Sequence, residues 1–180
     1  MKNIAYHILD IVHNSIKARA DLITICLLEE TKQNTLTLII KDNGKGMSDK
    51  QCRMACDPYF TSRKTRNVGL GLSFLKQNAE QSGGSFDLQS ELGKGTKVEA
   101  TFKTTNIDCP AMGDIVGAIH SLITTTQNVD FCYIHQKDKK EFKLDTLEIK
   151  SVLEGAPLYN KEISKYLKEM IFENLNEIAG

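Results

Sequence analysis

Residues 42–47 read DNGKGM, and only Lys41 separates them from the apolar run LTLII at residues 36–40. An acid and two glycines at the end of a strand have a plain interpretation as a turn, because glycine accepts positive φ and Asx side chains bond to their own backbone. The same residues also suit a ligand-binding loop, since glycines let a backbone come close to a ligand. The surrounding sequence has to decide between the two.

The composition limits the classes of protein to which this chain can belong. The chain has 180 residues and a hydrophobic content of 41%, enough for one substantial core or for one domain with an appendage. Lys plus Arg is 23 and Asp plus Glu is 23, and this balance argues against a general binder of nucleic acid or membrane surfaces. No apolar run has the length of a membrane-spanning helix, and the N-terminus lacks a signal peptide's apolar stretch, so we expect a cytoplasmic protein.

Five cysteines form no C-x-x-C pair, and their number is odd. They therefore indicate neither a disulfide framework nor a zinc site, and we expect buried structural thiols.

Hydrophobic periodicity predicts helices and strands over residues 1–103. Apolar residues recur at helix spacing over residues 4–19, and β-branched runs predict strands at 22–28 and 35–40. Ser48 is an expected N-cap for a short helix that ends near Cys56. Residues 57–69 read as a loop, and a helix over 70–82 ends at Gly83–Gly84. Two more strands are expected at 85–90 and 96–103.

The pattern of apolar and polar residues changes after Lys103. The stretch TTNIDCP at residues 104–110 reads as a junction, because proline favours extended structure before it. Beyond it the pattern predicts a helix over 113–124, a hairpin with strands at 129–134 and 141–144, and an amphipathic helix from Lys161.

The first predicted helix carries a polar stripe opposite its isoleucines: Asp10, His13, Asn14 and Lys17 recur at i, i+3, i+4 and i+7. The plain interpretation is a solvated helix face. The residue types also suit nucleotide chemistry, because a carboxylate can take a proton from water, an amide oxygen is a hard ligand for Mg²⁺, and an ammonium suits a phosphate.

Two further stretches are rich in glycine. Residues 61–66 are basic and hydroxyl-rich, and VGLGL at 68–72 follows them directly ahead of a helix, whose N-terminus offers free N–H groups to an anion. A mobile surface loop is the alternative, and the P-loop pattern is absent. GKGT at 93–96 could be a simple hairpin turn.

Taken in order, the polar helix, DNGKGM, VGLGL and GKGT resemble the N, G1, G2 and G3 boxes of the gyrase, Hsp90, histidine kinase and MutL (GHKL) ATPase superfamily. The resemblance covers residues 4–103. It implies a two-layer α/β sandwich, with a mixed, mostly antiparallel sheet, helices on one face, and ATP between the helices and a flexible lid. The implied division of the chain is an ATP-binding domain at 1–104 and a C-terminal α+β extension at 105–180.

By this resemblance, Asp42 accepts a hydrogen bond from the adenine amine, which favours adenine over guanine because a carboxylate cannot donate. Gly44 and Gly46 let the backbone approach the base, Met47 lines the adenine pocket, and Thr96 helps to hold a water between Asp42 and the base.

The resemblance also assigns the phosphate side. Asn14 matches the Mg²⁺-binding asparagine, and Lys17 falls where related proteins contact phosphate. Asp10 stands where hydrolysing members carry a glutamate, so its shorter reach leaves its role as a catalytic base in question. The implied lid and helix start supply the remaining ATP contacts: Thr61, Ser62, Arg63, Lys64, Val68, Gly69, Leu70, Gly71 and Leu72.

The sequence shows no upstream dimerisation helix with a phosphoacceptor histidine. His7 and His13 lie on the nucleotide helix, and His120 and His135 lie in the extension. Residues from 104 onward resemble the tails of small stand-alone bacterial ATP-binding proteins of the superfamily, and we expect them to cover the sheet or to make a dimer contact.

Three functions therefore stay open: ATP-dependent phosphorylation of a separate protein, as in histidine kinases or anti-sigma serine kinases; a slow ATPase switch; and a non-catalytic adenine-nucleotide sensor. We expect ATP and Mg²⁺ as ligands, a protein partner in trans, a possible homodimer, and neither nucleic acid nor membrane.

Overall fold

The computed structural model describes residues 3–57 and 70–180. One six-stranded sheet runs through it in the order β3-β4-β2-β1-β5-β6. The β1–β5 pair is parallel and the other neighbouring pairs are antiparallel. The strands are β1 (Leu22–Glu30), β2 (Thr35–Asp42), β3 (Ser85–Glu91), β4 (Gly95–Lys103), β5 (Asp130–Lys137) and β6 (Lys140–Asp145).

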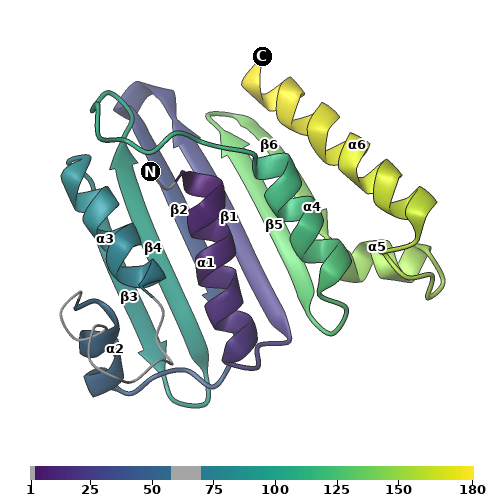
Figure 1. Cartoon of the computed structure of the whole chain (residues 1–180). Coiled ribbons are helices and arrows are strands. Elements are labelled where there is room, and N and C mark those ends of the chain that lie inside the picture. The colour runs from purple at the N-terminus through teal and green to yellow at the C-terminus, as the bar shows by residue number, and fades with distance from the viewer. Residues whose placement is uncertain (1–2, 58–69) are drawn as a thin grey trace.

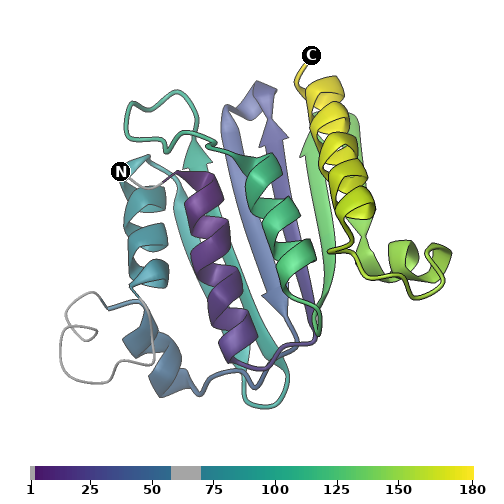
Figure 2. The ribbon, with the colours of Figure 1, turned by 45° about the vertical axis from the view of Figure 1, so that its right-hand side comes forward.

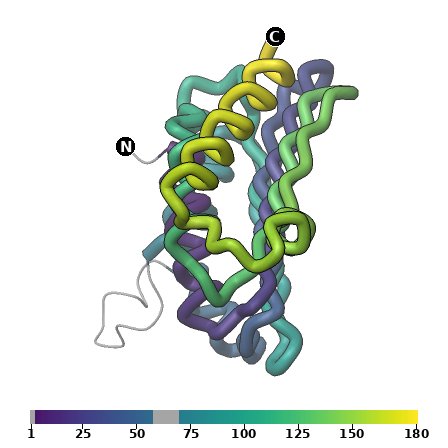
Figure 3. Tube along the Cα trace, turned by 90° about the vertical axis from the view of Figure 1, so that its right-hand side faces the viewer, coloured from purple at the N-terminus to yellow at the C-terminus, as the bar shows by residue number. Residues whose placement is uncertain are grey.

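Helices form a second layer on one face of this sheet, as the edge-on view shows (Figure 3). Four helices run side by side across that face in the order α3, α1, α4, α6, while α2 lies at one end and α5 follows β6 (Figures 1 and 2). Their bounds are α1 (Ile4–Lys17), α2 (Asp49–Ala55), α3 (Gly71–Gln81), α4 (Ile115–Thr125), α5 (Thr146–Val152) and α6 (Lys161–Ala179). The predicted two-layer α/β sandwich is confirmed.

Alternation along the strands builds the core. Ile23, Ile25 and Leu27 of β1 are buried, while the residues between them are half-buried on the opposite face. The same alternation holds in β2, β4 and β5, so one sheet face packs on the helices and the other carries no helix among the described residues.

Local signals set the helix ends as predicted. Ser48 caps α2 in a capping box with Gln51. At the end of α3, the Gly83 N–H donates to Glu80 and the Gly84 N–H donates to Ala79, with φ of +79° at Gly83. This is a Schellman ending, in which glycine is favoured because it accepts positive φ.

The helix expected over 113–124 begins later, at Ile115, because the Asp114 side chain caps it by accepting the Gly117 N–H at 2.7 Å. The five cysteines are free and half-buried rather than buried. Burial raises the pKa of each thiol, which keeps the thiols protonated at neutral pH.

The segment after Lys103 extends the sheet. β5 pairs with β1 along its length, and α4 and α6 continue the helix layer. Before α4, the carbonyls of Ala111 and Met112 accept the first free N–H groups of α1, from Ile4 and Ala5, at 2.9 and 3.0 Å. The strands before and after residue 104 belong to one sheet. The division of the chain into two domains at this residue stays a prediction.

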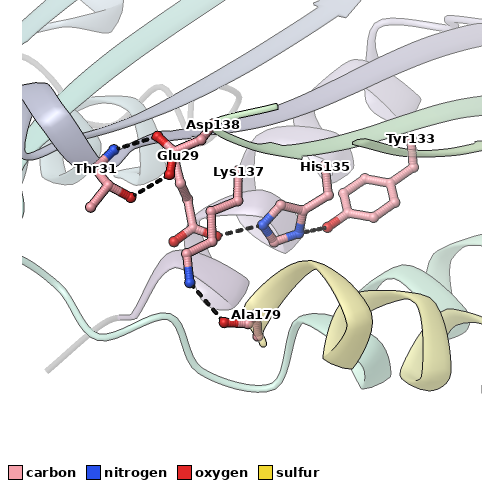
Figure 4. Close-up of polar contacts among 7 residues, drawn as sticks. All are labelled: Glu29, Thr31, Tyr133, His135, Lys137, Asp138 and Ala179. Atoms are coloured by element: carbon pink, nitrogen blue, oxygen red, sulfur yellow. Dashed lines mark hydrogen bonds and ion pairs between the residues drawn. The ribbon is translucent and has the colours of Figure 1, made fainter. Parts of the chain in front are cut away.

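A polar network joins β5 to β1 on the helix face (Figure 4). His135 Nε2 lies 2.7 Å from Glu29 Oε1, and His135 Nδ1 lies 2.9 Å from the Tyr133 hydroxyl. Burial, and then the Glu29 charge, raises the pKa of Tyr133, so its hydroxyl keeps a proton to donate to Nδ1.

Two separate contacts lie beside this network, one at a turn and one at a helix end. Asp138 in the β5–β6 turn accepts the N–H and the hydroxyl of Thr31, at 2.9 and 2.7 Å (Figure 4). Lys137 donates to the Ala179 carbonyl in the last turn of α6, where a cation complements the helix dipole.

Candidate nucleotide-binding site

Asp42 is the last residue of β2, and its carboxylate is buried, with 7% of the residue exposed. Its Oδ2 accepts from the Ser15 hydroxyl at 2.6 Å, and its Oδ1 accepts from the Gly44 N–H at 2.9 Å. Within residues 3–57 and 70–180, no cationic side chain pairs with it. A buried carboxylate held by neutral donors keeps spare acceptor capacity, and such a group is a candidate for ligand recognition.

Ser15 reaches Asp42 from the buried face of α1. It follows Ile8, Ile11 and Val12 along that face and is itself 3% exposed. A hydroxyl among aliphatic side chains needs a partner, and the adjacent carboxylate supplies one. Asp42 is therefore fixed by a helix that the chain places 27 residues earlier.

The glycines of DNGKGM are required by contacts within the protein itself. A Cβ at Gly46, where φ is +66°, would lie 1.9 Å from the Glu91 carbonyl oxygen, and one at Gly44 would lie 2.8 Å from the Ala18 carbonyl oxygen. Gly95 meets the Asp42 carbonyl in the same way, at 2.0 Å. The two glycine-rich turns thus pack directly on each other's backbone, whatever approach to a base they also permit.

Ser90 on β3 joins these two turns. Its hydroxyl accepts the Met47 N–H at 2.8 Å and lies 2.8 Å from both the Gly95 carbonyl oxygen and the Thr96 hydroxyl. All three bonds form together when Ser90 donates to Gly95 and Thr96 donates to Ser90. Thr96 lies opposite Asp42 in the β2–β4 register, so Met47, Thr96 and Asp42 hold one fixed arrangement.

The polar face of α1 meets the start of α3. A Cβ on Gly71 would lie 3.1 Å from the Asp10 Cβ, so the two helices are in close contact there. Asp10 and Asn14 are half-buried, and no hydrogen bond engages the Asn14 side chain among the described residues. Lys17 is exposed in the last turn of α1. The structure thus brings Asp10 to the glycine-rich helix start.

Several predicted site residues cannot be placed. Thr61, Ser62, Arg63, Lys64, Val68 and Gly69 lie outside the described residues. Of the rest of that set, Leu70 precedes α3 and is 47% exposed, while Gly71 and Leu72 are buried in its first turn. Their roles toward ATP stay predictions.

Two residues of the site, Ser15 and Ser90, were missed in the sequence. Each interrupts an apolar pattern on a core-facing side: Ser15 after Ile8, Ile11 and Val12, and Ser90 after Phe86 and Leu88 in the alternation of β3. A lone hydroxyl in such a position signals a buried hydrogen bond, although not with which residue.

Other kinds of site are not seen in the part of the chain described. Residues 3–57 and 70–180 hold no cluster of three or more His, Cys, Asp or Glu that could bind a metal. Among the same residues, no helix is both long and apolar enough to cross a membrane.

Comparison with known proteins points to one family. A family model described as histidine kinase-, DNA gyrase B-, and HSP90-like ATPase matches residues 3–106. The sensor histidine kinase ZraS of Klebsiella oxytoca is 34% identical over 90 residues, which is 49% of this chain and 19% of that protein. The sensor protein SrrB of Staphylococcus aureus (strain NCTC 8325 / PS 47) is 39% identical over 64 residues, or 33% and 11% of the two chains.

Among solved structures, the N terminal domain of a DNA repair protein superposes with a TM-score of 0.53 at 15% identity, covering 86% of this chain and 58% of that one. This likeness supports the fold alone. The matches span 11% to 19% of the length of the curated relatives, so the activities of those whole proteins do not transfer directly.

Proposed function

Because the chain belongs to the family of histidine kinase-, DNA gyrase B- and HSP90-like ATPases, we propose that it binds ATP with Mg²⁺ and transfers the γ-phosphoryl group to a separate protein. Membership of an ATPase family implies ATP binding. Mg²⁺ dependence and the acceptor are the proposal. Since the reaction consumes ATP, we propose the cytoplasm as its compartment.

The observation that carries the proposal is that α1 touches both Asp42 and the start of α3. Ser15, on its buried face, holds Asp42 at 2.6 Å. Asp10, on its polar face, contacts Gly71 at the start of α3. An adenine at Asp42 and phosphates at the α3 N-terminus would therefore lie along one helix, and the free N–H groups there suit an anion.

At the base end, Asp42 would accept the hydrogen bond of the adenine amine on its spare lone pairs. Guanine carries a carbonyl oxygen at that place, and two acceptors facing each other repel. The Ser90 network would keep Met47 and Thr96 in place beside the base.

At the phosphate end, the residues present fit Mg²⁺. Asn14 and Asp10 stand four residues apart on one face of α1 and offer oxygen atoms. Mg²⁺ bound with a nucleotide usually takes only one or two protein ligands, with waters and phosphate oxygens completing its shell. Bound there, it would neutralise phosphate charge, and Asn14 would hold the nucleotide in register.

The histidines of this chain favour an acceptor on another protein. His7 and His135 are buried, and His120 Nε2 lies 2.9 Å from the Ser164 hydroxyl. His13 is exposed, but it lies on α1 directly beside Asn14. In the transfer, the bond from the γ-phosphorus to the bridging oxygen of ADP breaks and a bond to the acceptor atom forms, with the acceptor's proton released.

A second candidate, an ATPase switch, is favoured by the contact between Asp10 and Gly71. A carboxylate at the start of α3 would stand close to the γ-phosphate, where it could take a proton from an attacking water. The nucleotide state would then change the interaction with a partner.

One labelling experiment separates the two. The protein is incubated with γ-labelled ATP, Mg²⁺ and lysate of its native host, beside Asn14→Ala as the binding control and His13→Ala as the self-labelling control. Label in a protein band, lost in Asn14→Ala and kept in His13→Ala, supports the kinase. Label only in free phosphate, lost in Asp10→Asn while ATP still binds, supports the switch. No label above the Asn14→Ala background contradicts both.

A further inference from the structure

An apolar groove lies between α5 and α6. These two helices lie beside β6, at the edge of the sheet farthest from the candidate nucleotide site (Figures 1 and 2). The volume of the groove is about 500 Å³, and its lining includes Val152 at the end of α5, Leu153 directly after it, and Ile163, Tyr166 and Met170 of α6. This surface lies away from the candidate nucleotide site, and the core buries only part of it.

The groove walls leave much apolar area in water. Val152 is 79% exposed and Tyr166 is 66% exposed. In α5 only Thr146 is buried, and Ile149 packs partly against the core, whereas Leu147 is 52% exposed. Contiguous apolar surface of this kind, bordered by charges, is characteristic of an interaction site.

The charges along the groove are acidic. Within the described part of the chain, Glu148 and Glu162 are the only charged residues that line the groove. From Glu162, the positions i+4, i+7 and i+11 are Tyr166, Glu169 and Glu173, which form one line along α6 beside the groove. Lys143 partly offsets Glu148, at 3.3 Å, and Lys165 partly offsets Glu169, at 3.8 Å.

The lysines of α6 follow a separate line. From Lys161, the positions i+4, i+7 and i+11 are Lys165, Lys168 and Phe172. They begin one position out of phase with the acidic line, and none of them lines the groove. The groove thus presents an apolar floor with an acidic border.

We propose that this groove binds a basic amphipathic helix of a partner protein. Apolar side chains at i, i+3, i+4 and i+7 would enter the groove, and lysines or arginines on either side would face Glu162 and Glu173. The α6 lining from Glu162 to Met170 extends about 12 Å at 1.5 Å per residue, which suits about two turns of such a helix. The inference is independent of the nucleotide site.

The test is fluorescence anisotropy on the full chain with synthetic probes. The first probe is a fluorescein-labelled peptide of about four helical turns, with Leu at i, i+3, i+4 and i+7 and Lys elsewhere. A second has every Lys replaced by Glu, and a third has the first peptide's composition in scrambled order. Saturable binding of the first alone is the expected result.

Variants then locate the binding. Val152→Ser with Tyr166→Ser is expected to weaken the lysine peptide roughly tenfold or more, because both side chains would be anchors. Phe172→Ser, at 56% exposure on the lysine line of the same helix, is the matched control and should bind as the parent does. Glu162→Lys with Glu173→Lys should weaken the lysine peptide and strengthen the glutamate peptide. Circular dichroism and thermal unfolding verify that each variant is folded.

Three results would overturn the proposal. The first is that the lysine peptide shows no saturable binding up to its solubility limit. The second is that the scrambled peptide binds as tightly as the lysine peptide. The third is that Phe172→Ser weakens the lysine peptide as much as Val152→Ser with Tyr166→Ser does. Light scattering of the chain alone is the remaining check. Self-association that Val152→Ser with Tyr166→Ser abolishes would make a second copy the occupant instead.

Discussion

Asp42 shows how single residues determine this site. Its carboxylate is buried and receives one hydroxyl and one backbone N–H, without a cation among the described residues. A buried anion with a cationic partner would be stabilised at the expense of its availability to a ligand. The neutral donors instead fix its position and leave lone pairs for a hydrogen-bond donor.

Replacement of Asp42 by Asn should therefore lower ATP affinity by about 1–3 kcal/mol, since an amide can present N–H groups to the adenine amine. GTP affinity should change little. Titration calorimetry with both nucleotides measures this, with the exposed Asp87→Asn on β3 as control. Equal losses for ATP and GTP would contradict base recognition by Asp42.

Ser15→Ala should destabilise the fold by about 1.5–3 kcal/mol, because a hydrogen bond to a buried carboxylate is lost. Ser73→Ala is a matched control: Ser73 is also buried, but its hydroxyl donates to the carbonyl of Leu70, only three residues away at the N-cap of the same helix. Urea unfolding gives both values. If Ser15→Ala costs no more than Ser73→Ala, the bond to Asp42 does not hold the site.

At the scale of elements, turns and strands are locked by backbone contacts that leave no room for a side chain. Gly46 and Gly93 test this as a pair, since both have positive φ, at +66° and +78°. A Cβ on Gly46 would meet the Glu91 carbonyl oxygen at 1.9 Å, while one on Gly93 would meet nothing within 4 Å.

Gly93→Ala should thus cost only the strain of a left-handed alanine, about 1–2 kcal/mol. Gly46→Ala should cost about 1–3 kcal/mol more, because the two turns must move apart. It should also weaken ATP binding. Urea unfolding and calorimetry check both effects, and equal costs for the two variants would mean that the turns separate freely.

Hydrogen bonds among the side chains of Tyr133, His135 and Glu29 also join β5 to β1. Tyr133→Phe removes the donor to His135 Nδ1 at a buried place, so we expect a loss of about 1–3 kcal/mol in the free energy of unfolding. Tyr159→Phe, at 55% exposure, should be neutral. A neutral Tyr133→Phe would show that the hydroxyl does not stabilise the pair.

For the whole molecule, the question is whether residues 1–104 fold without residues 105–180. The second part covers the free edge of β1 with β5 and supplies carbonyls to the N–H groups of Ile4 and Ala5. Removing it would leave these groups and the α1 surface that faces α4 without partners.

We therefore expect the full chain to unfold in one transition, and a chain ending at Thr104 to lack cooperative unfolding. Circular dichroism against temperature tests both, with addition of a peptide of residues 105–180 as a rescue. A chain ending at Thr104 that melts as sharply as the parent would support two independent domains.

Signals within a few residues were sufficient to predict the six strands of the sheet, every α-helix of the described residues except α5, and the order of the glycine-rich boxes. The capping box of Ser48 and the ending at Gly83–Gly84 involve neighbours only, so the pattern contains all the information. The family resemblance implied that Thr96 acts beside Asp42, and the β2–β4 register then placed the two residues opposite each other.

The remaining contacts join residues far apart in the chain. Ser15 meets Asp42 across 27 positions, and His135 meets Glu29 across 106. Alternation places these polar side chains on buried faces but cannot choose their partners, because strand order and register depend on the packing of the whole sheet. The parallel pairing of β5 with β1, and the groove that α5 and α6 form beyond it, were likewise determined only by the tertiary structure.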